Sequence, residues 1–213
     1  MILEPMTMIT DYLLCALAVV LGLRLWRAGR ASGERTVQLW GASFLTMAVA
    51  AFAGGTSHGF AAMLGITGQM VLWKLTVWSI GLTAFQLLAA TAHAALGGTT
   101  RRVVLALAAL QLVVFVVWMI RHEAFIWVIA DYLPAVLVAL VLQLRLCLRH
   151  CPGAGWLIAG LLTTLVGAAV QASGFALHPS FNHNDLYHVI QMAATVMLYC
   201  GALLARDLPQ PTA

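Results

Sequence analysis

The sequence predicts an all-α, polytopic membrane protein with seven transmembrane helices, its N-terminus outside and its C-terminus inside. The chain of 213 residues is 62% hydrophobic and 8% charged, with a mean hydropathy of +0.95, whereas soluble domains carry about 25% charged residues. Seven apolar runs, each long enough to span a bilayer, are separated by short breaks. Nine of the ten arginines lie in or beside alternate breaks, which is typical of a topology signal.

The apolar runs predict helices of roughly 18 to 24 residues, which is the length that a bilayer requires. They cover residues 9–27, 36–58, 67–92, 103–120, 124–146, 154–176 and 185–205. The breaks are too short for a second folded unit, so we expect a single transmembrane domain over residues 1–213. The first run has no basic segment before it, so we expect it to remain a membrane helix and not a cleaved signal peptide.

The arginines orient the helices. They follow the first, third, fifth and seventh runs, at Arg27, Arg30, Arg35, Arg101, Arg102, Arg145, Arg149 and Arg206. Cytoplasmic loops carry the excess of basic residues, so these breaks are predicted to lie inside. One lysine against ten arginines suggests a GC-rich bacterial genome, and we expect the bacterial inner membrane. The expected partners are membrane lipids and a homo-oligomer or partner subunit, not nucleic acid.

Polar residues are concentrated just before and within the start of the seventh predicted helix, in HPSFNHNDLYHVIQ (178–191). On that helix Asn184, His188, Gln191 and Thr195 share one face. Asn182, Asn184 or Asp185 is expected to cap it. His183 and His188 are five residues apart, about 140° around a continuous helix, so both reach one ion only if His183 precedes the helix.

A metal site is the first interpretation of this cluster. Zinc takes three or four N, O or S ligands, usually from separate segments. His58, at the end of the second predicted helix, has the same predicted depth as the histidines of the seventh. We therefore predict an outward-facing, zinc-like site formed by His58, His183, His188 and Asp185. A hydrogen-bonded, solvated helix start is the alternative. Gln171 is expected to line the same pocket.

Charged residues inside membrane helices are functional candidates because their insertion is unfavourable. Lys74 and Asp131 each lie about seven residues from the outer end of a helix, at a depth of roughly 10 Å. We predict that they form an ion pair, which serves either as a structural bridge or as a proton relay or substrate clamp. Asp11 is predicted about one turn into the first helix.

Seven helices, an outer N-terminus, His58 on the second helix and His188 on the seventh resemble the CREST superfamily, which includes alkaline ceramidases and the progestin and adiponectin (PAQR) receptors. The resemblance implies a zinc ion held by three histidines, with a serine and an aspartate assisting a zinc-bound water that attacks a lipid amide. The family usually has a serine four residues before the first histidine, where this chain has Gly54, with Ser57 adjacent to His58. Asn184 replaces the first histidine of the final pair.

The sequence therefore favours a metal-dependent membrane hydrolase of lipid amides or esters, with zinc as cofactor. Asp131 or Asp11 is the candidate base, Lys74 the group that polarises a carbonyl, and Ser57 an assisting hydroxyl. Two alternatives stay open. One is a non-catalytic transporter, sensor or complex subunit that uses the Lys74–Asp131 pair. The other is an electron-transfer protein with haem held between His58 and His188.

Overall fold

The structure, a computed structural model, describes residues 2–178 and 180–209. In this part of the chain there are six α-helices and no strand: α1 (Pro5–Ser32), α2 (Arg35–Ala95), α3 (Gly98–Arg121), α4 (Ile126–Leu148), α5 (Ala154–Ser173) and α6 (His183–Leu204). All six are long and apolar enough to cross a membrane. The prediction of an all-helical chain is confirmed, and its apolar helices fit a membrane protein.

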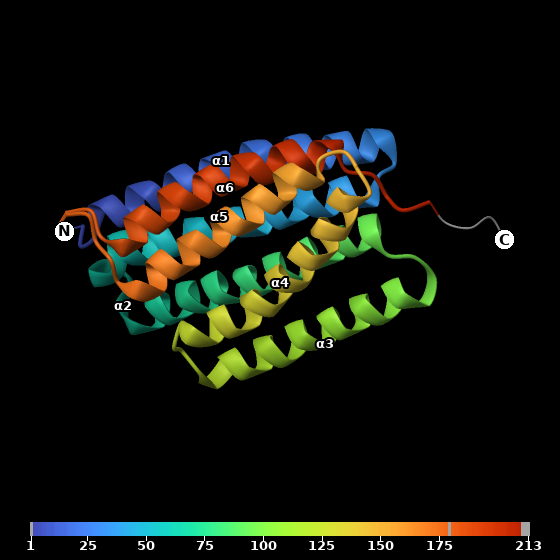
Figure 1. Cartoon of the computed structure of the whole chain (residues 1–213). Coiled ribbons are helices and arrows are strands. Elements are labelled where there is room, and N and C mark those ends of the chain that lie inside the picture. Colours follow the sequence, from blue (N-terminus) through green and yellow to red (C-terminus); the bar gives the residue numbers. More distant parts are fainter. Residues whose placement is uncertain (1, 179, 210–213) are drawn as a thin grey trace.

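Helix α2 folds back on itself. Its 61 residues include two with non-helical backbone angles, Phe60 and Gly65, and the φ of +62° at Gly65 favours glycine. We call residues 35–59 the first arm and residues 66–95 the second arm. The Thr36 hydroxyl on the first arm donates to the Ala90 carbonyl on the second, at 2.9 Å. The arms therefore run antiparallel, and α2 turns back at the end of the molecule where the N-terminus lies (Figure 1).

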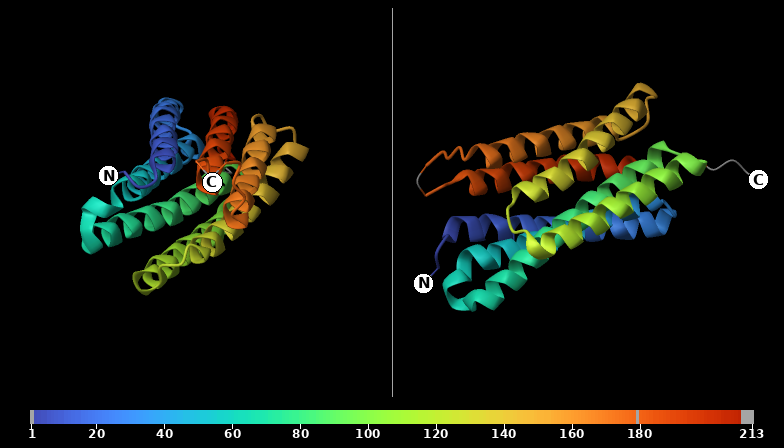
Figure 2. Two further views of the ribbon diagram at one scale, coloured as in Figure 1. Left: turned by 90° about the vertical axis from the view of Figure 1, so that its left-hand side faces the viewer. Right: turned by 90° about the horizontal axis from the view of Figure 1, so that it is seen from below.

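The helices pack side by side as an elongated bundle (Figures 1 and 2). The N-terminus, the bend of α2, the α3–α4 connection and the start of α6 lie at one end, which we call the N-terminal end; the C-terminus lies at the other (Figure 1). Helix α3 lies at the edge of the bundle, with only Ala108, Phe115 and Met119 buried. Most of its apolar side chains face outward, as expected of a helix in contact with lipid.

Glycines bring α1 close to the first arm of α2 near the N-terminal end. A Cβ atom added at Gly55 would lie 2.8 Å from the Cβ of Asp11, and one at Gly59 would overlap the side chain of Met8. Small residues let membrane helices approach this closely. This contact fixes the position of Asp11 relative to α2.

The segment after α6 holds the opposite end of the bundle together. The Asp207 carboxylate accepts hydrogen bonds from the backbone N–H groups of Arg35 and Thr36, each at 2.8 Å. The Asp207 N–H donates to the Glu34 carboxylate at 2.6 Å. Asp207 therefore satisfies the free N–H groups at the start of α2, the role that a residue next to the helix usually has.

Candidate functional site

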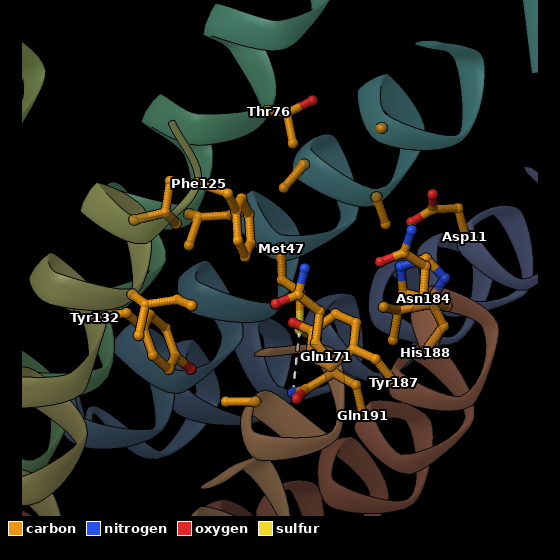
Figure 3. Close-up of a pocket in the computed structure, with 18 of the residues that line it drawn as sticks. Asp11, Met47, Thr76, Phe125, Tyr132, Gln171, Asn184, Tyr187, His188 and Gln191 are labelled. Carbon is orange, nitrogen blue, oxygen red and sulfur yellow. Dashed lines mark hydrogen bonds and ion pairs between the residues drawn. The ribbon is translucent and has the colours of Figure 1, made fainter. Parts of the chain in front are cut away.

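A pocket of about 390 Å³ lies between α1, both arms of α2, α4, α5 and α6 (Figure 3). Apolar and aromatic side chains form most of its wall, among them Met47, Phe125, Tyr132 and Tyr187. Its polar lining includes Asp11, Ser57, His58, Gln171, His183, Asn184, His188 and Gln191. Three residues predicted on one face of the last helix, Asn184, His188 and Gln191, therefore do face the pocket together, and Gln171 joins them as predicted.

The most buried ionisable side chains of the pocket are Asp11 and His188. Asp11 is 4% exposed and His188 is 7% exposed. The ring atom Nε2 of His188 lies 3.2 Å from Oδ1 of Asp11, which brings α6 against α1. Figure 3 shows the two side chains together at one side of the pocket, next to Asn184. The contact gives the buried Asp11 carboxyl group a polar partner.

The second nitrogen of the His188 ring contacts the Thr10 hydroxyl, at 3.0 Å from Nδ1. The same hydroxyl oxygen lies 3.0 Å from the carbonyl oxygen of Thr7. A hydroxyl has one hydrogen, so it donates either to Nδ1 or to the carbonyl. In the first case Nδ1 accepts and the ring is neutral; in the second Nδ1 carries a hydrogen, and the ring is the other neutral tautomer or, with Nε2 also protonated, positively charged. Rotation of one hydroxyl therefore satisfies both protonation states of His188, as an acid–base centre requires.

The start of α6 is built by a capping box. Asn182 is the N-cap, and its side chain accepts from the N–H groups of Asn184 and Asp185. Asp185 in turn accepts from the Asn182 N–H at 2.7 Å and from the Thr7 hydroxyl at 2.8 Å. Of the three predicted caps, Asn182 is therefore the N-cap. Both carboxylate oxygens of Asp185 accept hydrogen bonds that hold the helix start and α1.

The other predicted zinc ligands lie as follows. His58 lines the pocket, but its Nδ1 lies 3.1 Å from the Glu4 carboxylate. His183 is the first residue of α6, so the condition under which it reaches an ion together with His188 is not met. Within residues 2–178 and 180–209, no group of three or more His, Cys, Asp or Glu side chains is spaced to hold a metal ion. The zinc site of His58, His183, His188 and Asp185 stays a prediction.

Lys74 has a different partner from the one predicted. Its ammonium group donates to the carbonyl of Met119 at 2.6 Å, and lies 3.8 Å from the Glu123 carboxylate. Met119 belongs to the last turn of α3, whose carbonyls have no partner within the helix. Lys74 therefore caps the end of α3, and its charge is compensated there.

Asp131 is also separate from the pocket. It lines a small cavity between the second arm of α2, α3 and α4, where Gln111 donates to its carboxylate at 3.1 Å and to its carbonyl at 2.6 Å. Within the described part of the chain, no ion pair joins it to Lys74. The predicted Lys74–Asp131 pair is thus replaced by two local contacts, and Asp11 is the one candidate base that lies beside His188.

The sequence did not point to Glu4, Thr7, Thr10 or Thr164 as residues of this site. Glu4 and the two threonines of α1 contact histidine or aspartate more than 50 positions away in the chain. One sequence feature could have identified the threonines of α1. Thr7, Thr10 and Asp11 are spaced so that they lie on one side of an otherwise apolar helix.

Comparison with known families gives one match. Residues 6–207 match a family of unknown function, DUF6962. Comparisons with curated proteins and with solved structures each gave no match.

Proposed function

We propose that this chain, which belongs to the DUF6962 family of unknown function, is an integral membrane protein that binds an amphipathic, lipid-class molecule in the pocket. The polar group of that molecule contacts the Asp11–His188 pair, and its apolar part contacts the aromatic and aliphatic wall. The two-part character of the pocket carries this proposal: a wide apolar cavity with a buried acid–base pair at one side. Ligand pockets typically combine apolar walls with a few polar groups that orient the ligand.

The proposal includes the topology expected from the sequence. A straight helix of 61 residues would be about 92 Å long, some three times the hydrocarbon thickness of a bilayer. The antiparallel arms are instead each of spanning length, so we propose that α2 crosses the membrane twice and that the chain crosses seven times. The arginines then place the N-terminal end, and with it the pocket, on the outer side.

Asp11 is the residue that we propose for proton transfer. Its Oδ1 contacts His188, whereas its Oδ2 has no hydrogen-bond partner among the described residues and lies beside Gly54 on the pocket wall. An unengaged carboxylate oxygen on a pocket wall can accept a proton from a bound water or ligand. His188 would stabilise the carboxylate, and the Thr10 hydroxyl would adjust to the charge on the ring.

Hydrolysis of a lipid amide or ester is the second candidate function. His58 and His188 both line the pocket, which supports it, because a zinc-dependent hydrolase of the predicted kind needs histidines from both helices at one site. Zinc binding would require Asp11 or His188 to exchange a protein hydrogen bond for the metal. A transporter, sensor or complex subunit that depends on Lys74 paired with Asp131 is less well supported, because these residues have other partners.

The direct test is ligand binding by the purified protein in nanodiscs. The probes are N-acyl ethanolamines with saturated chains of 8 to 16 carbons, which carry an amide, a hydroxyl and one apolar chain. We expect saturable binding, which Asp11→Asn and His188→Gln weaken about tenfold or more, because each removes an ionisable group that hydrogen-bonds the ligand. Asp131→Asn is the matched control: the same change at a buried aspartate outside the pocket, with affinity unchanged.

The same preparations separate the candidate functions. One zinc per chain by elemental analysis, lost in both His58→Ala and His188→Ala, together with release of fatty acid from the probe, would favour the hydrolase. A Soret absorption band lost in the same variants would favour haem and electron transfer. If no probe binds saturably, or if Asp131→Asn weakens binding as much as Asp11→Asn, the proposed pocket is wrong.

A further inference from the structure

Three side chains in the wall of the pocket, Trp73, Thr164 and Gln191, have a buried polar atom without a hydrogen-bond partner among the described residues. Within the described residues, the side-chain oxygens of Thr164 on α5 and Gln191 on α6 have none. Each residue is 4% exposed, and both line the pocket. Buried polar groups in proteins are almost always hydrogen-bonded, and in a bilayer there is no bulk water to replace a missing partner.

The Thr164 hydroxyl lacks a hydrogen bond that the hydroxyls of nearby threonines make. Threonines in helices commonly donate to the carbonyl four residues earlier. Thr163 does so to Ala159 at 2.8 Å, and Thr195 does so to Gln191 at 2.7 Å. Thr164 makes no such bond, although the backbone of α5 continues unbroken on both sides. Its hydroxyl is therefore available to a molecule in the pocket.

Thr164 and Gln191 line the same pocket about one helical turn apart along the bundle. Gly160 and Gly167 of α5 pack against Leu198 and Ile190 of α6, so the antiparallel register sets Thr164 opposite Ala194, three residues beyond Gln191. Gln191 Nε2 has only a long contact of 3.8 Å to the Met47 sulfur, drawn as a dashed line in Figure 3. The Thr164 and Gln191 side chains do not hydrogen-bond to each other. Both are therefore available to one polar group of a ligand in the pocket.

We infer that Thr164 and Gln191 form a subsite for a hydroxyl group of the ligand. This inference rests on the proposed function and deepens it. A hydroxyl suits the subsite because it both donates and accepts: it can donate to the Gln191 carbonyl oxygen and accept from Thr164. It also tolerates either orientation of the glutamine amide, which a pure donor or a pure acceptor does not.

The position of the subsite also defines the spacing of the ligand's polar groups. Gln191 follows His188 by three residues on α6, which corresponds to about 4.5 Å along the helix axis. The ligand class is therefore an amphiphile with two polar groups a few bonds apart. One lies against Asp11 and His188, and the other is a hydroxyl against Thr164 and Gln191.

The test compares two probes of nearly the same shape, N-dodecanoylethanolamine and N-dodecanoylpropylamine, in which a methyl group replaces the hydroxyl. We expect the wild-type protein to bind the hydroxyl probe about tenfold more tightly, because the methyl probe leaves both protein groups unpaired. Thr164→Val and Gln191→Met should abolish this preference. Thr163→Val is the control, since it is the same change one residue away, at a hydroxyl outside the pocket, and should retain it.

The stability of the ligand-free protein gives an independent readout. Thr164→Val should raise the Tm by about 2–4 °C, because it removes an unpaired buried hydroxyl. A lower Tm would mean that the hydroxyl is already hydrogen-bonded in the free protein, and would overturn the subsite. A preference for the hydroxyl probe that survives both substitutions would also overturn it, while the proposed function would stand. If neither probe binds the wild-type protein, both proposals fall.

Discussion

Adding one methyl group at Gly55 should separate α1 from the first arm of α2. The new Cβ would lie 2.8 Å from the Asp11 Cβ and 3.2 Å from the Tyr12 ring. Carbon atoms pack best at about 3.5–4.0 Å, so the methyl is about 1 Å too close to Asp11. The Asp11 Cβ is bonded directly to the α1 backbone and cannot rotate away, so relief requires the helices to move apart.

The size of the effect follows from two opposing contributions. Overpacking of this kind costs about 1–3 kcal/mol, whereas replacing glycine by alanine within a helix contributes about 0.5–1 kcal/mol of stability. We therefore expect Gly55→Ala to lower the free energy of unfolding by about 0.5–2 kcal/mol. Gly54→Ala is the matched control: its Cβ would lie 3.5 Å from the nearest atom of Asp11, an ordinary contact, so this variant should be slightly stabilised.

The assay is thermal unfolding of the purified variants in one detergent, followed by tryptophan fluorescence. The expected order of Tm is Gly54→Ala, then wild type, then Gly55→Ala. Separation of the helices also moves Asp11 away from His188, so Gly55→Ala should bind the N-acyl ethanolamine probes more weakly. Equal Tm values for Gly54→Ala and Gly55→Ala would refute the close packing of α1 on α2 from which this expectation is derived.

Three further predictions concern the ends of the helices. Asp207→Ala should destabilise the protein by about 1–2 kcal/mol, measured by chemical or thermal unfolding, because two N–H groups at the start of α2 lose their acceptor; Arg206→Ala, at an exposed ion pair, should have little effect. Asn182→Ala should cost about 1 kcal/mol through loss of the capping box of α6. In double-mutant cycles, Lys74→Met and Asp131→Asn should be additive within about 0.5 kcal/mol. Lys74→Met and Glu123→Gln should instead be coupled, and the reverse pattern would restore the predicted Lys74–Asp131 pair.

The sequence by itself determined the helical, strongly apolar character of the chain and part of the polar pocket. Spanning helices depend on the length and hydropathy of a continuous segment, which is local information. The common face of Asn184, His188 and Gln191 depends only on helical periodicity, and the cap at Asn182 only on residues within three positions of it. These features were predicted because no other helix is needed to produce them.

The partners of the buried charges were decided only by the tertiary structure. Depth along a helix can be estimated from the sequence, but rotation about the helix axis and the choice of neighbouring helix cannot. Lys74 and Asp131 share a depth, yet Lys74 faces the end of α3 and Asp131 faces Gln111. His188 faces Asp11 because glycines hold α1 against α2 and Thr7 ties α1 to the start of α6. Packing contacts and hydrogen bonds of this kind select which helices meet, and they join residues far apart in the chain.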